Sequence, residues 1–194
     1  MGFMDGPPLA TSADLEAYLQ RDIPTEQAEV SLRIASAVVR GFTGQQITFV
    51  AGDTMVLEGG GSVVVLPQRP VVVDVDNPIE VVELAEYGGG NLDGTDGVTY
   101  TRFQDQLQRY CGTWSPRVQV TYSHGYATVP GDVLAAVLDI AGRSLTNPSG
   151  LRSVTIDDYS RTYASETFGG ASLSEANKLT LANYRRPVST TRLS

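Results

Sequence analysis

Cysteine, histidine and lysine are almost absent from this chain: each occurs once in 194 residues, as Cys111, His124 and Lys178. A single cysteine excludes an intrachain disulfide and a zinc site built from several thiolates. The glycine-rich stretches lack the Gly-Lys-Ser/Thr signature, so they form no phosphate-binding loop. The 14 basic residues are outnumbered by 22 acidic ones, which gives a net charge of −8. Such an acidic chain does not fit a protein that grips nucleic acid through clustered cations.

Long hydrophobic runs are also absent. The longest are valine-rich stretches near Val63 and Val71, far shorter than the roughly 20 residues of a membrane-spanning helix. The first residues carry neither the basic region nor the apolar run of a signal peptide. Gly6 stands where N-myristoylation requires Ser or Thr. We therefore expect a soluble protein that is made in a cytoplasm, does not bind membranes, and forms one domain, with or without a large insertion.

With one histidine, any mechanism that uses imidazole must pass through His124. Its neighbour Ser123 lies on an extended run, so their side chains are expected on opposite faces of a strand. No Gly-x-Ser-x-Gly elbow supplies another nucleophile. We interpret His124 as a turn residue satisfied by local backbone and Cys111 as buried filler. A hydrolase built on His124 is the alternative, in which His124→Ala would abolish activity.

Acidic residues form three groups. Asn91, Asp93, Asp96 and Gly97 resemble a calcium loop only loosely, because the glycine is misplaced and no bidentate Glu follows. We interpret this segment as a solvated hairpin tip. The other two groups are interpreted as solvated strand or loop faces: Asp157 and Asp158 beside Arg161, and Glu80, Glu83 and Glu86. The chain is therefore predicted to have no catalytic residue, no metal and no cofactor.

Two helices are expected before residue 46. Thr11 and Asp14 form a capping-box variant that opens a short helix, and a second helix starts at Pro24 and ends at Gly41. The second helix carries two apolar stripes, which indicates burial on two sides. The stripes are Ala28, Leu32, Ala35 and Val39, and Val30, Ile34 and Val38.

Two further helices are expected after residue 122. One follows Pro130, with Asp132 as its N-cap, and is apolar around most of its circumference. A capping box of Ser172 and Glu175 opens the last, from Leu173 to about Tyr184. Between these two helices, residues 151–168 fit a hairpin or an extended arm.

Between residues 46 and 122 the pattern changes to short strands. They are rich in Val, Thr and Tyr and are separated by Gly- and Asn-containing turns. The expected strands are 47–50, 54–57, 63–66, 71–75, 81–84, 98–102, 107–110 and 118–122. We predict an α+β fold, a small helical bundle with an inserted antiparallel β-sandwich or barrel. Its segments are 1–45, 46–122, 123–172 and 173–194.

Several stretches, taken in order, carry a family resemblance. They are Leu9-Ala-Thr-Ser-Ala-Asp-Leu-Glu-Ala-Tyr-Leu, Ala-Ser-Ala-Val-Val-Arg at 35–40, Leu66-Pro-Gln-Arg-Pro-Val, Val120-Thr-Tyr-Ser-His-Gly-Tyr and Val129-Pro. Over most of its length the chain resembles the head–tail connector (adaptor) proteins of long-tailed phages, especially those infecting actinobacteria. The β insertion departs from the short all-helical members of that family.

The resemblance implies a non-enzymatic virion protein of the phage neck. Family members form a dodecameric ring under the portal protein and lengthen the channel through which genomic DNA passes without specific binding. They also offer a platform to a head-closure or tail-terminator protein. The family's C-terminal segment docks on the portal, which here corresponds to Leu173, Leu181, Tyr184, Arg185, Arg186 and Arg192.

Ring assembly also sets expectations for other surfaces, because a head-to-tail contact buries two different flanks of each subunit. We expect inter-subunit contacts at Leu32, Ile34, Val38, Val133, Val137 and Leu138. Tyr159 and Tyr163 are expected on an arm that reaches a neighbour or the portal, or on a hairpin that packs on its own subunit. Two alternatives stay open: another neck ring protein, such as a head-closure protein or tail terminator, and a β-sandwich ligand-binding module with Trp114 in an exposed aromatic platform.

Overall fold

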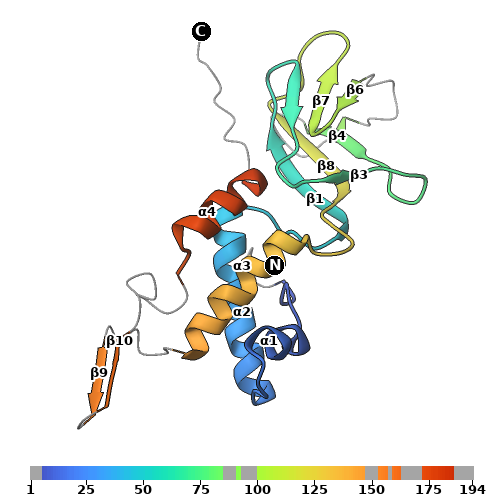
Figure 1. The fold of residues 1–194 in the computed structure, drawn as a ribbon. Helices are drawn as coiled ribbons and strands as arrows, with labels where there is room; N and C mark the ends of the chain where they lie inside the picture. Colours follow the sequence, from blue (N-terminus) through green and yellow to red (C-terminus); the bar gives the residue numbers. More distant parts are fainter. Residues whose placement is uncertain are drawn as a thin grey trace. The chain divides into compact units, whose positions relative to one another are not determined.

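The computed structural model describes residues 6–84, 91–92, 100–146, 153–156, 159–162 and 172–185, with only the backbone of 91–92, 153–156 and 159–162. These residues form helices and antiparallel sheets, so the α+β prediction is confirmed (Figure 1). Two compact units divide the chain. A helical unit lies within Met1–Gln45 and Val129–Arg185, and a β unit includes Gln46–Thr128. The β unit therefore extends past residue 122, where we expected it to end.

The helical unit contains four α-helices in its described residues. They are α1 (Ser12–Leu19), α2 (Thr25–Thr43), α3 (Gly131–Thr146) and α4 (Glu175–Leu181), which runs into a 3₁₀ turn (Ala182–Tyr184). The capping box of Thr11 and Asp14 is present as predicted. α2 continues past Gly41, because the left-handed conformation that ends it is adopted by Gly44, at φ 67°.

The caps of α3 and α4 differ from prediction. α3 begins at Gly131, so Asp132 lies in its first turn and accepts from the backbone of Val133 at 2.9 Å. α4 is capped by Ser174, whose hydroxyl accepts from the backbone N–H of Asn177 at 3.2 Å. The predicted box at Ser172 is wrong because two serines lie close together and only the second is followed by helical backbone.

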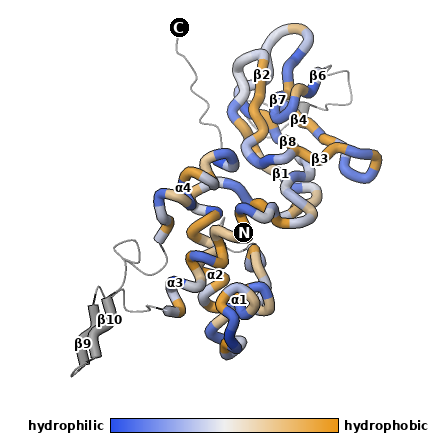
Figure 2. The backbone as a smooth tube through the Cα atoms, in the orientation of Figure 1, coloured by the Kyte–Doolittle hydropathy of each residue, from blue (hydrophilic) through white to orange (hydrophobic). Residues whose placement is uncertain are grey.

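α3 is the central helix of this unit and packs against α1, α2 and α4. Hydrophobic residues recur along α3 (Figure 2), and those from Val133 to Gly142 are largely buried. Leu15 of α1, Leu32 of α2 and Leu181 of α4 are fully buried in the same unit. Each such side chain stabilises the fold by about 1.5–3 kcal/mol relative to exposure.

Two antiparallel sheets form the β unit. The larger has the order β1 (Val50–Glu58), β8 (Arg117–His124), β4 (Glu80–Leu84) and β5 (Asn91–Leu92), and β3 (Val71–Val72) also pairs with β8. The smaller has the order β2 (Val63–Val65), β7 (Gln106–Arg109) and β6 (Tyr100–Phe103). The described strands close no barrel, since the larger sheet ends at β1 and β5.

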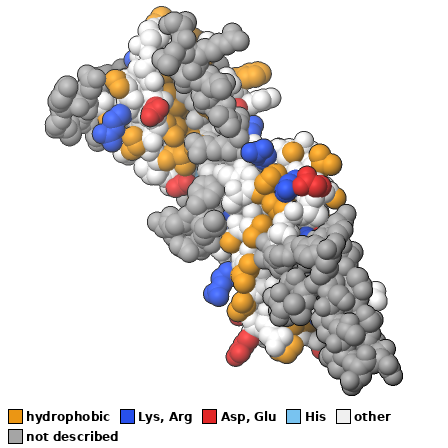
Figure 3. Space-filling model, turned by 90° about the vertical axis from the view of Figure 1, so that its left-hand side faces the viewer, with side chains coloured by type: hydrophobic (Ala, Val, Ile, Leu, Met, Phe, Trp, Pro, Cys, Tyr) orange, Lys and Arg blue, Asp and Glu red, His pale blue; other side chains and the backbone are white. Residues whose placement is uncertain are grey.

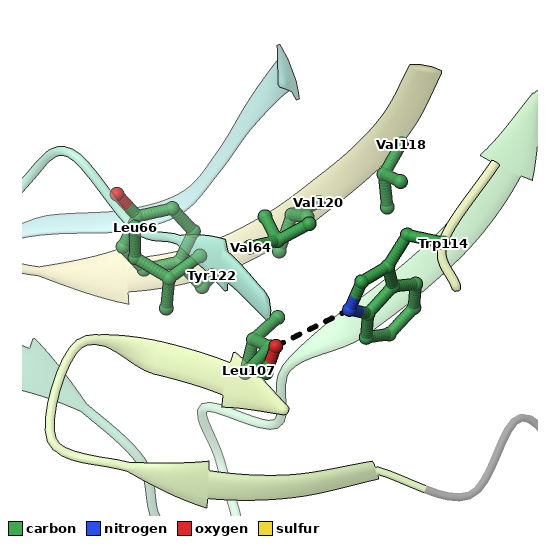
Figure 4. Packing of buried hydrophobic residues seen from close by; sticks show 7 residues of the cluster. All are labelled: Val64, Leu66, Leu107, Trp114, Val118, Val120 and Tyr122. Carbon is green, nitrogen blue, oxygen red and sulfur yellow. Dashed lines mark hydrogen bonds between the residues drawn. The ribbon is translucent and has the colours of Figure 1, made fainter. Parts of the chain in front are cut away.

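One apolar cluster is shared by both sheets (Figure 4). β8 contributes alternate residues to it, as its period of two predicts. The indole N–H of Trp114 donates to the carbonyl of Leu107 at 3.3 Å, so the one polar atom of that ring is satisfied. The cluster consists of Val64, Leu66, Leu107, Trp114, Val118, Val120 and Tyr122.

The strands expected at 47–50 and 71–75 differ from prediction. Residues 47–50 form no separate strand, because Ile47 has φ 67° and Thr48 makes only an isolated bridge to Tyr126. The strand expected at 71–75 ends at Val72, before a tight turn. In 151–168, the described residues form a hairpin of β9 (Ser153–Ile156) and β10 (Tyr159–Thr162). The rest of that segment lies outside the described residues.

Candidate functional site

A bulge in β1 builds a polar corner of the β unit. The pairing of β1 with β8 shifts between Val50 and Asp53, and Gly52 there has φ 57°. A bulge of this kind re-aims the groups that follow it. Here the backbone N–H of Gly52 donates to Oγ of Ser123 at 3.0 Å. The carboxylate of Asp53 reaches His124, with its Oδ2 3.1 Å from Nε2.

The hydroxyl of Ser123 makes two structural hydrogen bonds, and its proton is used in one of them. It accepts from Gly52 and lies 2.8 Å from Oδ1 of Asn77, to which it donates. Asn77 belongs to the turn between β3 and β4, so Ser123 connects three separate segments of the β unit. No hydrogen bond joins Ser123 to His124 within the described residues. The geometry therefore does not favour a Ser–His nucleophile at this position.

His124 is the last residue of β8 and is only 1% exposed. Its Nδ1 has no hydrogen-bond partner among the described residues. Burial lowers the pKa of His124, and the hydrogen bond and charge of Asp53 oppose this only in part. The hydrogen bond to Asp53 assigns the proton to Nε2, which leaves Nδ1 as a buried lone pair. The interpretation as a turn residue satisfied by local backbone is wrong, because the partner is a side chain on β1.

Glu83 is buried, which corrects its interpretation as a solvated residue. Its Oε1 accepts from the guanidinium of Arg109 at 2.5 Å and from the backbone of Ser115 at 2.9 Å. Arg109 also lies over the ring of Trp114, 5.6 Å from its centroid. The sequence contained a signal for this burial. Glu83 lies two positions after Val81 and so on the same face of the strand, and Val81 packs on the apolar cluster.

Two other expectations about single residues are corrected. Cys111 is exposed rather than buried, because it follows β7 in the connection to β8. Trp114 is 1% exposed, so it cannot belong to the exposed platform of a ligand-binding module. The loose calcium motif of Asp93, Asp96 and Gly97 lies outside the described residues, as do Glu86 and the pair Asp157 and Asp158.

Neither metal binding nor membrane insertion receives support from the described part of the chain. It holds no group of three or more His, Cys, Asp or Glu side chains that could bind a metal ion. Within the same residues, no helix is long and apolar enough to cross a bilayer.

The two apolar stripes of α2 have different environments. Ala28, Leu32, Ala35 and Val39 are buried inside the helical unit, whereas Val30 and Ile34 are 45% and 42% exposed. Ala37 and Val38, on the same side as Ile34, are half-buried. We call Val30, Ile34, Ala37 and Val38 the outer stripe.

Burial within the helical unit leaves fewer of the expected inter-subunit contact residues accessible to another copy. Leu32, Val133, Val137 and Leu138 are buried by their own unit and offer almost no surface to another copy. Ile34 and Val38 keep accessible surface. Figure 3 shows that hydrophobic side chains lie on the surface among charged ones.

The expected portal-docking residues are largely engaged within the helical unit. Leu181 is buried, Tyr184 donates to Asp132 at 2.8 Å, and the guanidinium of Arg185 lies 5.3 Å from the ring centroid of Phe42. Leu173 is half-buried. Leu179, which the sequence analysis did not single out, is 76% exposed on α4.

Four expected contact residues have no described side chain. Arg186, Arg192 and Tyr163 lie outside the described residues, and Tyr159 is described by its backbone in β10. The described residues thus contain a buried polar corner within the β unit and, separately, an uncovered apolar stripe within the helical unit. A comparison of the chain with known protein families and with curated proteins finds no match.

Proposed function

We propose that this protein is a head-to-tail adaptor of a long-tailed bacteriophage, a neck protein of the virion whose copies form a ring beneath the portal. The ring would extend the DNA channel and present a platform to a head-closure or tail-terminator protein. Its fold would be a small helical bundle that carries an inserted β-sandwich. The resemblance of the sequence motifs motivates this proposal.

One structural observation gives the proposal its main support: α2 buries one apolar stripe in its own unit and leaves the other accessible. Ile34 and Val30 are only about half covered in the single chain, although side chains of this kind stabilise a protein by being buried. An uncovered stripe on a rigid helix is typical of a protein–protein interface. A second copy is the partner that a ring requires.

The acidic character of the chain suits a channel for DNA. A net charge of −8 per copy, repeated around a ring, repels the phosphate backbone instead of binding it. DNA could then slide through the lumen without being held. Three of the described arginines, Arg40, Arg109 and Arg143, bind acceptors of their own chain and so are not available to hold a phosphate.

The proposal is tested by assembly with the portal protein encoded by the same genome. We expect sedimentation and negative-stain microscopy to show closed rings that co-sediment with portal, at one fixed ratio of copies. Ile34→Asp should abolish the rings. Val56→Asp, a matched change at an exposed β-branched residue on β1, should leave them intact. A chain that stays monomeric at all concentrations and does not bind portal would overturn the proposal.

A further inference from the structure

The turn between β3 and β4 presents an apolar tip to solvent. Val75 is 97% exposed and Val73 is 44% exposed. Figure 1 shows this segment projecting from the strands of the β unit. We call residues 73–77 the valine turn. Two valines in this position lose the stabilisation that burial would give them.

The valine turn is held rigidly by its own side chains. The backbones of Asp74 and Asn77 are paired in both directions, at 3.4 and 3.3 Å. Oδ1 of Asp74 accepts from the backbone of Asp76 at 3.0 Å, and from the backbone and the amide of Asn77 at 2.9 and 2.8 Å. Ser123 then ties Asn77 to β8. An ordered tip loses little entropy when it is buried by a partner.

The charges on the valine turn restrict the kind of surface it fits. Asp74 and Asp76 flank Val75, and the whole chain has a net charge of −8. Anionic lipid would repel such a tip. The matching surface is a protein face that is apolar at its centre and carries a cation at its edge.

The outer stripe of α2 is such a surface. Val30 and Ile34 lie one turn apart on a helix of 19 residues. Arg33 is exposed beside them and makes no hydrogen bond or ion pair with any described residue. Two other exposed apolar residues beside a cation, Leu179 and Phe103, lack this combination. Lys178, next to Leu179, is paired with Glu175, and Arg102, next to Phe103, donates to the carbonyl of Gln104.

We infer that the valine turn of one copy packs on the outer stripe of α2 in the next copy. Val75 and Val73 cover Ile34 and Val30, and Asp76 pairs with Arg33. This inference rests on the proposed ring and names the two flanks that meet in it. The two surfaces differ, so the contact is heterologous and each copy can bind one neighbour on either side. Such contacts close into a ring or extend as a filament.

Two variants that each remove one flank test the inference. Val75→Asp and Ile34→Asp should each raise the dissociation constant between copies at least about 30-fold, the usual effect of losing a central apolar anchor. Mixed in equal amounts, they should form heterodimers and nothing larger. A pair of the two different variants retains one intact contact, which the valine turn of the Ile34→Asp copy makes with the outer stripe of the Val75→Asp copy.

Cross-linking locates the contact directly. In chains whose Cys111 is replaced by Ser, a Val75→Cys copy is mixed with an Ile34→Cys copy and treated with a short bismaleimide. We expect a covalent dimer of the two different copies. The matched control mixes Ile34→Cys with Val56→Cys, since Val56 is an exposed valine on β1 away from the turn. This control pair should give at least tenfold less dimer.

The outcomes separate this inference from the proposed function. Rings that form normally with Val75→Asp, or equal cross-linking of Val56→Cys and Val75→Cys, would overturn the pairing and leave the ring itself standing. A wild-type chain that is monomeric at every concentration, with and without portal, would overturn both. Unchanged Trp114 fluorescence and thermal unfolding in each variant show that the loss is not a folding defect.

Discussion

The hydroxyl of Ser123 donates to Oδ1 of Asn77 across 2.8 Å and so connects the central strand of the larger sheet to the turn that carries Val75. The same oxygen accepts from Gly52 in the bulge of β1. Although it lies beside the chain's only histidine, this serine stabilises the conformation of an exposed turn. Its two hydrogen bonds explain why a polar side chain is buried there.

Ser123→Ala should lower the free energy of unfolding by about 1–2 kcal/mol, because the backbone N–H of Gly52 and Oδ1 of Asn77 each lose a hydrogen-bond partner. Urea unfolding followed by Trp114 fluorescence measures this loss. Hydrogen exchange at the amides of Asp76 and Asn77 should quicken. Thr121→Val, which removes an exposed hydroxyl bonded to Thr54, should change stability by no more than about 0.5 kcal/mol. A Ser123→Ala protein as stable as wild type would contradict the anchoring role.

Stability should fall as the pH is lowered through the titration of His124. Burial lowers its folded pKa below the ordinary 6.5, so between these two values the unfolded chain binds a proton that the folded chain does not. The stabilisation is fully present above about pH 7.5 and is lost toward acid pH, with a limiting slope of about 1.4 kcal/mol per pH unit. Protonation would also leave an N–H on Nδ1 without a partner.

Urea unfolding at several values between pH 5.5 and 7.5 measures the slope. His124→Gln removes the titrating group and keeps a donor for Asp53, so its stability should vary less over this range. Subtracting the two curves removes the contribution of carboxylates. Equal slopes in the two proteins would show that His124 titrates alike in the folded and unfolded chain.

Arg109→Met should destabilise the β unit by about 3 kcal/mol, because the Glu83 carboxylate, with 8% of its side chain exposed, would lose its cation. Replacing both partners, with Glu83→Leu as the second change, should recover most of that loss. A double-mutant cycle on urea unfolding gives their coupling. Coupling near zero would mean that water replaces Arg109 at no cost.

Gly125→Ala should be among the most damaging single changes in the β unit. Gly125 has φ 92°, and an added Cβ would lie 2.3 Å from the carbonyl oxygen of Thr48. Strain and the clash together should cost at least about 3 kcal/mol. Gly112→Ala isolates the strain, since φ is 75° there and nothing lies within 4 Å. Its cost should be about 1 kcal/mol, and thermal unfolding of the two variants compares them.

Local patterns in the sequence predicted the features that depend on residues close together in the chain. The Thr11 capping box lies within four consecutive residues, and the buried alternation of Val118, Val120 and Tyr122 lies within one strand. The two stripes of α2 follow from its helical period. Side-chain pairings between different strands were not predictable in this way. Asp53 meets His124 from 71 positions away, and Glu83 meets Arg109 from 26 positions away.

The amino-acid sequence by itself determined where helices and strands form and which of their faces are apolar, because capping, turn chemistry and periodicity act over a few residues. Only the tertiary structure decided which apolar face is covered. Leu32 and Ile34 lie on the same helix, yet α1, α3 and α4 pack on the side of Leu32 and leave Ile34 exposed. Burial depends on elements far away in the chain, and no local pattern records where those elements come to lie.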